Sequence, residues 1–139
     1  MTTKSSGFSL IELLVVVAIL GIIASIGIVS YTGYVSGAKR KSAENVMQQI
    51  SLGQTEYYSD NGTYFLNSNS ANCSPTSATS TAIETNLLGG SDNINDEMGY
   101  QICISNDASS NYKVFATETG GGSCKISMSA LNVITRTNC

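Results

Sequence analysis

Residues 7–29 read GFSLIELLVVVAILGIIASIGIV, and this stretch decides the architecture of the chain. From Phe8 to Val29 the only strongly polar residue is Glu12. A helix over these residues would be about 33 Å long, which matches the ~30 Å hydrocarbon core of a bilayer. The stretch therefore predicts a membrane-spanning helix.

A cleaved secretory signal peptide is the alternative for this apolar stretch. Such peptides combine a basic head, an apolar run of about 7 to 15 residues and a small-residue cleavage site after it. Here the head carries only Lys4, the apolar run is longer, and no Ala-x-Ala-like break follows it. We therefore expect the helix to stay on the protein.

The composition excludes several classes of function. Hydrophobic residues make up 42% of the 139 residues and charged residues 12%, which is too apolar for a disordered protein and fits a single domain. The chain has no His, which excludes mechanisms that need an imidazole base or ligand. We expect a protein that is not an enzyme and that uses no cofactor.

Gly7 and Phe8 stand directly before the apolar run, and Glu12 follows four residues later. This arrangement resembles the N-terminus of type IV prepilins, in particular the class IVa leader and the small minor pilins. The resemblance implies that a prepilin peptidase cleaves after Gly7 and that the new N-terminal Phe8 is N-methylated. Val29 stands where many major pilins carry proline, which favours a minor pilin or a pseudopilin.

Glu12 also stands out on physical grounds. A carboxylate in the centre of a spanning helix costs about 2.5 to 3.5 kcal/mol, so it needs a partner, a position near the rim or a function. The resemblance implies that Glu12 pairs with the Phe8 ammonium of a neighbouring subunit during filament assembly. The alternative is an acid that is merely tolerated in the first turn, where the helix dipole favours it.

Beyond the span, apolar residues at spacings of three and four predict that the helix continues to about Tyr58. Residues 60–62, Asp-Asn-Gly, should end it, because Asn and Gly accept the left-handed cap conformation. The expected apolar face comprises Tyr31, Val35, Ala38, Ser42, Val46, Ile50 and Tyr57. The charged residues expected largely off this face, in solvent, are Lys39, Arg40, Lys41 and Glu44.

The C-terminal half changes from helical to strand-like periodicity. Residues 66–85 are rich in Asn, Ser, Thr and Ala and predict an irregular connection within a loop over residues 60–98. Alternating apolar residues near positions 100–104, 112–116 and 124–128 predict an antiparallel meander of three or four strands. The fold class expected is α+β, with a long N-terminal helical spine packed on this sheet, which is also the pilin fold.

Four cysteines lie beyond the span, which suits an oxidising exterior or periplasm. Four cysteines allow three pairings, and sequence alone does not choose among them. The pair Cys124–Cys139 matches the disulfide-bounded C-terminal loop of pilins, and we choose it together with Cys73–Cys103. The lack of His and of CxxC spacing argues against a metal site, so none is expected.

These observations divide the chain into a leader over residues 1–7, a transmembrane and filament-core helix over 8–29, and an extracytoplasmic pilin domain over 30–139. That domain comprises an amphipathic helix half over 30–58, the connecting loop over 60–98, and the sheet with its disulfide-bounded loop over 99–139. The resemblance places the protein in the bacterial inner membrane as a single-pass protein with its C-terminal domain in the periplasm. After assembly it would be part of an extracellular pilus.

The function implied is a structural subunit of a type IV pilus that serves adhesion, twitching motility or DNA uptake. A pseudopilin of a type II secretion system is the alternative, although Glu118 is the only acid after Asp107 and would make a poor calcium site. The partners implied are prepilin peptidase, other pilin subunits and the inner-membrane assembly machinery. No direct binding of nucleic acid is expected, because acids outnumber the basic residues from position 60 onward.

Overall fold

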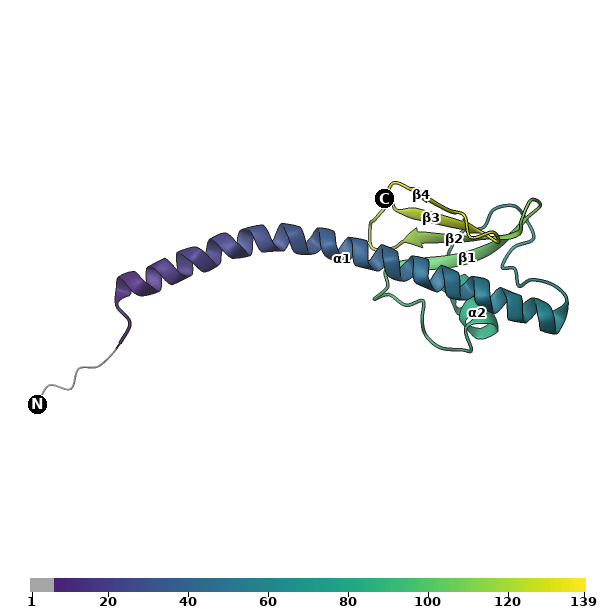
Figure 1. Cartoon of the computed structure of the whole chain (residues 1–139), viewed down its shortest axis with the longest axis horizontal. Coiled ribbons are helices and arrows are strands. Elements are labelled where there is room, and N and C mark those ends of the chain that lie inside the picture. The colour runs from purple at the N-terminus through teal and green to yellow at the C-terminus, as the bar shows by residue number, and fades with distance from the viewer. Residues whose placement is uncertain (1–6) are drawn as a thin grey trace, which may run out of the picture. The chain divides into compact units, whose positions relative to one another are not determined.

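The computed structural model describes residues 7–139, so the predicted leader lies outside the described residues except for Gly7. The described chain divides after residue 38 into two compact units, and each is described by itself. The elements, coloured along the chain in Figure 1, are α1 (Leu10–Asn61), α2 (Ser77–Leu87), β1 (Tyr100–Asp107), β2 (Asn111–Glu118), β3 (Lys125–Ser129) and β4 (Ile134–Thr137).

The sequence explains where helix α1 ends. It ends at Asn61, and Gly62 follows with a φ of 74°, a left-handed conformation that glycine adopts without strain. The Gly62 amide donates to the Tyr58 carbonyl at 2.8 Å and satisfies one of the last free carbonyls of the helix. The predicted stop at residues 60–62 is confirmed.

In the first unit, residues 10–34 of α1 are exposed all round, and Glu12 is the only charged residue among them. This part of α1 contains a segment long and apolar enough to cross a membrane, none of which is buried within the structure. A helix that is hydrophobic on every face is stable in a bilayer or inside an assembly rather than in water. This is the surface expected of a span or a filament core.

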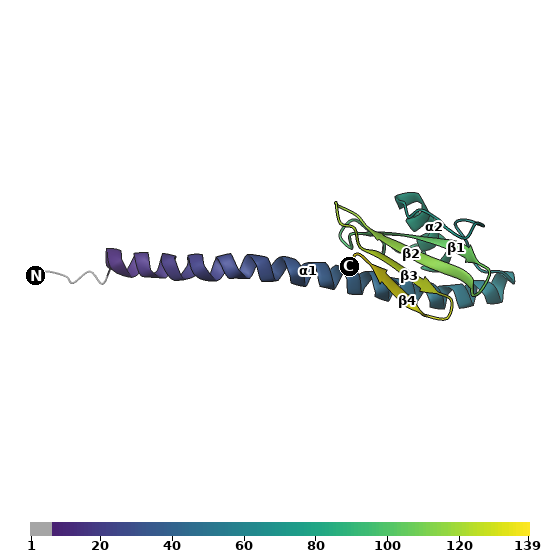
Figure 2. The same ribbon diagram turned by 90° about the horizontal axis from the view of Figure 1, so that it is seen from above.

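In the second unit, β1 to β4 form one antiparallel sheet in sequential order, a four-stranded meander seen from above in Figure 2. Tyr100 pairs with Glu118 and Asp107 with Asn111, so β1 and β2 are in register along their whole length. The α+β pilin-like architecture is confirmed, and the sheet has the larger of the two predicted strand numbers.

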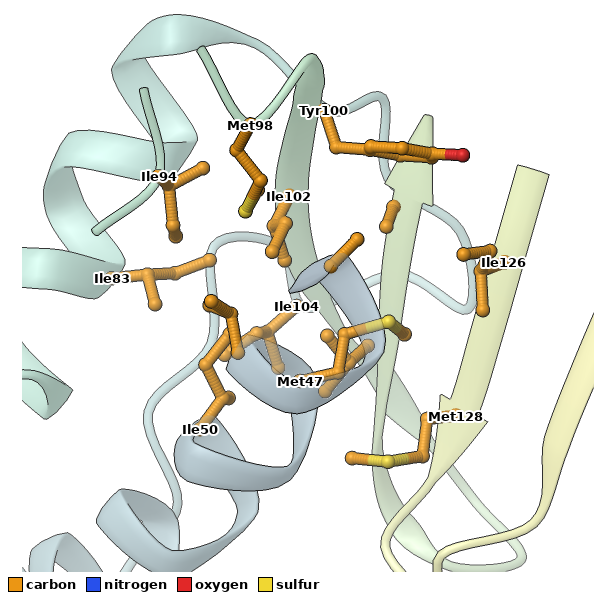
Figure 3. Close-up of a cluster of buried hydrophobic side chains, with 14 of the residues drawn as sticks. Met47, Ile50, Ile83, Ile94, Met98, Tyr100, Ile102, Ile104, Ile126 and Met128 are labelled. Atoms are coloured by element: carbon orange, nitrogen blue, oxygen red, sulfur yellow. The ribbon is translucent and has the colours of Figure 1, made fainter. Parts of the chain in front are cut away.

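One face of the sheet packs on the C-terminal part of α1. Figure 3 shows side chains from α1, from the sheet and from Ile83 of α2 pointing toward one another in this core. The buried stripe on α1 differs from the predicted one, because Ser42 is exposed while Ala43 and Met47 are fully buried. The positions that share the stripe at spacings of three and four are Ala43, Val46, Met47, Ile50 and Gln54.

The prediction of an irregular connection over residues 66–85 is wrong where α2 forms. The Thr76 side chain accepts a hydrogen bond from the Thr79 amide, and the Thr79 hydroxyl accepts one from the Thr76 amide, which caps the helix. Ile83 then anchors the helix in the core with 0% exposure. Helix α2 lies close to α1, since a Cβ on Gly53 would come within 2.6 Å of the Leu87 carbonyl oxygen.

Candidate functional site

The N-terminal segment places Phe8 in the open and builds a helix start directly behind it. Phe8 is 90% exposed and lies before the first helical residue. The Ser9 amide donates to Glu12 Oε2 at 2.8 Å, and the Glu12 amide donates to Ser9 Oγ at 3.3 Å. These reciprocal bonds form a capping box.

The capping box gives Glu12 a structural role that sequence reasoning missed. The signal was present as Ser-x-x-Glu ahead of an apolar run. A carboxylate has about four acceptor positions, so the contact with the Ser9 amide leaves room for an ammonium group. Capping and pairing with another subunit are therefore compatible, and the two roles need separate tests.

The sheet face turned away from α1 carries a different set of side chains from the core face. Alternation along the strands points Lys113, Phe115 and Thr117 of β2 outward, because Tyr112, Val114 and Ala116 are buried. The Lys113 Nζ lies 5.7 Å from the centroid of the Phe115 ring. A lysine and an aromatic ring thus lie together on this outer face.

A pocket of about 490 Å³ lies on the outer face, between β2 to β4 and the loop that contains Pro75. None of the residues that line it is acidic. We call it the outer-face pocket, and the lining residues important here are Ser74, Phe115, Thr117, Lys125, Ser127 and Thr135. Asp107 is an acidic residue on this sheet face, but it lies outside the pocket, at the end of β1 opposite Asn111.

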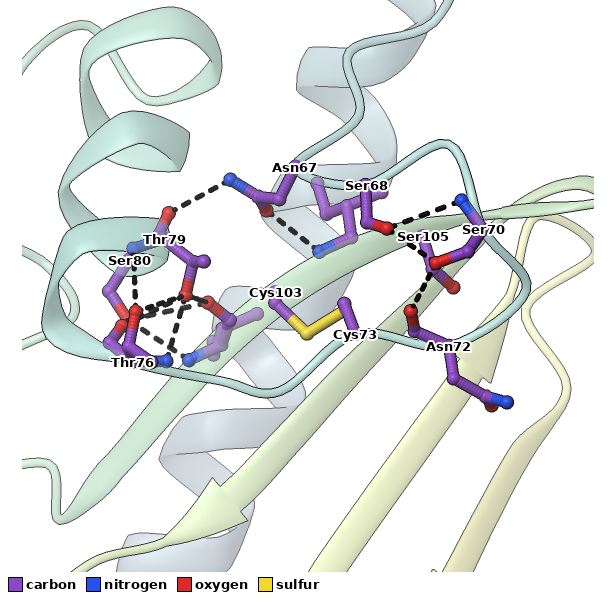
Figure 4. The surroundings of a disulfide bond; sticks show 12 residues. Asn67, Ser68, Ser70, Asn72, Cys73, Thr76, Thr79, Ser80, Cys103 and Ser105 are labelled. Atoms are coloured by element: carbon purple, nitrogen blue, oxygen red, sulfur yellow. Dashed lines mark hydrogen bonds between the residues drawn. A yellow bond between two sulfur atoms is a disulfide. The ribbon is translucent and has the colours of Figure 1, made fainter.

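A disulfide between Cys73 and Cys103 fastens the loop that walls this pocket to β1. Figure 4 shows this bond with Thr79 and Ser80 on one side and Ser68 and Ser105 on the other. The chain on either side of this disulfide is also bonded to the edge of β1. The Asn67 amide donates to the Ile104 carbonyl at 2.8 Å, and the Ile102 amide donates to Ser80 Oγ of α2 at 3.0 Å. The loop is therefore held along the strand, and the pocket has a fixed wall.

The second disulfide, Cys124–Cys139, closes the hairpin formed by β3 and β4. Both disulfides join the pairs chosen from the sequence. Arg136 of β4 also forms an ion pair with Glu44 of α1, so the hairpin is attached to the helix by charge as well as by packing.

Glu44 was predicted to lie in solvent, and the structure shows that it is buried. It is 5% exposed, and the hydrogen bond from Arg136 holds the pKa of its carboxyl below the ordinary value, with a further contribution from Lys41. The prediction failed because the partner that makes burial possible lies 92 residues further along the chain. A buried carboxylate is stable only when it is paired in this way.

Two of the three basic residues at positions 39–41 also form contacts within the fold. Lys41 Nζ lies 3.3 Å from Glu44, and Arg40 donates to the backbone oxygen of Cys139 at 3.4 Å. Part of the charge of this trio is thus used within the fold. Within residues 7–139, Lys39, Lys113 and Lys125 form no salt bridge, and of these Lys125 lines the outer-face pocket while Lys113 lies beside its Phe115. This position makes Lys113 and Lys125 the candidates for binding an anion in the pocket.

Two family models match the chain. The model described as "Type IV minor pilin ComP, DNA uptake sequence receptor" matches residues 29–126. The model described as "Prokaryotic N-terminal methylation motif" matches residues 2–28. No curated protein and no solved structure matches the chain.

Proposed function

We propose that this chain binds DNA through its outer-face pocket. The chain belongs to the type IV minor pilin family that the ComP model describes, and it is therefore a structural subunit of a type IV pilus. The family description names a receptor for a DNA uptake sequence. The proposal extends that role to this chain. The proposal differs from the sequence-based expectation, in which the negative net charge argued against direct binding of nucleic acid.

The observation that carries the proposal is the distribution of charge over the sheet. Net charge counts the whole domain, whereas a ligand meets one face. The outer-face pocket is lined by Lys125 and several hydroxyls, with Lys113 beside it and no lining carboxylate. Lysine, serine and threonine side chains are typical contacts of DNA phosphates.

Phe115 adds an apolar surface to this pocket. In the major groove, an apolar side chain can contact the methyl group of thymine, while lysines contact guanine or the phosphates. Two lysines neutralise at most two phosphates, so the logarithm of the binding constant should fall with the logarithm of salt concentration with a slope of about −2. A single subunit should therefore bind weakly, and its affinity should fall only about tenfold for a fourfold rise in salt concentration.

The proposal also assigns processing and filament assembly to the N-terminal segment. Prepilin peptidase would cleave after Gly7 and methylate Phe8, and Glu12 would pair with the Phe8 ammonium of a neighbouring subunit. Residues 8–29 would span the inner membrane with residues 30–139 in the periplasm. The presence of two disulfides supports that oxidising location.

The test uses the full chain in nanodiscs of zwitterionic phospholipid and a short fluorescent DNA duplex, with anisotropy measured over a series of salt concentrations. The variants Lys113→Gln and Lys125→Gln should each weaken binding and together abolish most of the salt dependence. Lys41→Gln is the matched control, since it removes the same charge from outside the pocket. The proposal is wrong if Lys41→Gln weakens binding as much as Lys125→Gln does, or if the double variant binds like the wild type.

A further inference from the structure

A second pocket lies at the end of the domain where the last turn of α1, the segment after it and the β1–β2 turn meet. Its volume is about 500 Å³, within the range of about 300 to 1,000 Å³ that small-molecule sites occupy. We call it the tyrosine pocket, and its lining includes Tyr58, Thr63, Tyr64, Asn106, Asp107 and Asn111. None of these side chains belongs to the outer-face pocket.

One wall of the tyrosine pocket is aromatic. The rings of Tyr58 and Tyr64 are stacked, with centroids 4.7 Å apart and an angle of 30° between their planes. Tyr64 is supported from behind by Tyr112 of β2, whose ring centroid lies 4.9 Å away. Tyr58 is 48% exposed, so the stack offers aromatic surface to solvent instead of filling the core.

This aromatic wall is held in place by a buried amide. Gln54 is fully buried, donates to the Phe65 carbonyl at 2.7 Å and accepts from the Phe65 amide at 2.8 Å. The two bonds fix the chain next to Tyr64. The wall is therefore organised before any ligand arrives, which lowers the entropy cost of binding.

The opposite wall is polar and offers both acceptors and donors. Asp107 accepts hydrogen bonds from Ser109 and Ser110, which orient its carboxylate and lower its pKa, the Ser110 bond being the main cause. Three donors engage its two oxygens, namely the Ser109 amide and the hydroxyls of Ser109 and Ser110, so about one of its roughly four acceptor positions remains for a ligand. Asn111 is exposed, and its side-chain amide can both donate and accept a hydrogen bond.

We propose that the tyrosine pocket binds a neutral sugar ring, as part of a glycan. A pyranose has a face of C–H groups that packs on an aromatic ring and a rim of hydroxyls that both donate and accept hydrogen bonds. The stacked tyrosines can pack on the C–H face of the sugar. The carboxylate of Asp107 and the amides of Asn106 and Asn111 can form hydrogen bonds with its hydroxyls.

The charge of the pocket determines which sugars it accepts. Asp107 is an anion, and no lysine or arginine lines the pocket. Sialic acids and DNA phosphates are anions, so both should be repelled. The two pockets share no lining residue, so the two functions can fail independently.

The test is saturation-transfer difference NMR on the full chain in phospholipid nanodiscs, which avoids detergents that carry glucose or maltose. The probes are methyl glucoside, methyl galactoside and methyl N-acetylglucosaminide at millimolar concentration, with N-acetylneuraminic acid as the anionic comparison. We expect transfer to at least one neutral probe, strongest at the C–H protons of one ring face, and at least tenfold less transfer to N-acetylneuraminic acid.

Two variants test whether any transfer comes from this pocket. Tyr58→Ala removes the exposed half of the stack, and Asn111→Gly removes the amide at a position where φ is 77°, which glycine accepts readily. Each should reduce transfer at least fivefold, while the exposed Leu52→Ala on the same helix should not change it.

The proposal is overturned if no neutral probe shows transfer, if N-acetylneuraminic acid shows as much as the neutral probes, or if both pocket variants retain wild-type transfer. Circular dichroism shows whether Asn111→Gly still folds. If it does not fold, the transfer measured with Tyr58→Ala decides whether the pocket binds the sugar. Duplex binding by Asn111→Gly should equal that of the wild type, which separates this site from the DNA proposal.

Discussion

Substitutions at Ser9 and Glu12 separate the two roles that Glu12 can play. Ser9→Ala removes the hydroxyl that accepts from the Glu12 amide and leaves the carboxylate in place. Glu12→Gln removes the charge but keeps a side-chain oxygen that can accept from the Ser9 amide. Glu12→Leu removes both the capping contact and the charge.

The expected losses differ enough to be measured. Loss of a helix cap costs about 0.5 to 2 kcal/mol, and this is the whole effect expected of Ser9→Ala. An ammonium left unpaired where water is scarce costs about 3 to 5 kcal/mol. Since about 1.4 kcal/mol is tenfold in an equilibrium constant, Glu12→Leu should reduce incorporation into filaments by roughly two to three and a half orders of magnitude.

The assay compares the mature subunit in the membrane fraction with the subunit in sheared, purified filaments, using mass spectrometry of Phe8 to confirm cleavage and methylation. Glu12→Leu should be inserted and cleaved, because a more apolar span inserts at least as well. It should then accumulate in the membrane. If Ser9→Ala reduces incorporation as much as Glu12→Leu does, the carboxylate acts through the helix cap and the pairing argument is refuted.

Two further predictions concern the stability of residues 30–139. Gly53→Ala should destabilise the fold by about 1 to 3 kcal/mol in chemical unfolding, because the new methyl group meets the Leu87 backbone, whereas Gly37→Ala, which meets nothing, should be neutral or slightly stabilising. The pKa of the Glu44 carboxyl is lower in the folded protein than its unfolded value of 4.5, so the ionised carboxylate stabilises the fold above pH 4.5. This stability is lost as the pH falls through the folded pKa. The melting temperature should therefore decrease below about pH 4.5, and it should decrease less in Arg136→Gln. Equal stability of the two glycine variants, or the same pH dependence with and without Arg136, would contradict these arguments.

Much of the fold follows from local patterns in the sequence. The apolar run, the Asp-Asn-Gly stop after α1 and the alternation in the strands each reflect an interaction between residues close in sequence. The resemblance to pilins supplied the choice of cysteine pairs, which spacing alone left open.

The parts that were missed depend on contacts between residues far apart in the chain. Helix α2 is built from serines and threonines that favour loops, and it forms because Thr76 caps it and Ile83 reaches the core. Glu44 can be buried only because Arg136 arrives on β4. The outer-face pocket likewise depends on which side of the sheet the helix covers, so a count of charges along the chain could not reveal it.

The central claim is that this pilin contacts DNA through the outer face of its sheet, and photo-crosslinking tests it most directly. A benzoylphenylalanine at position 115, in place of Phe115, should crosslink to a DNA duplex on irradiation, and the yield should fall as salt is raised. The same group in place of Leu52, which is exposed on α1, should give only background. Equal yields from the two positions, or none from position 115 while the duplex remains bound, would contradict the account.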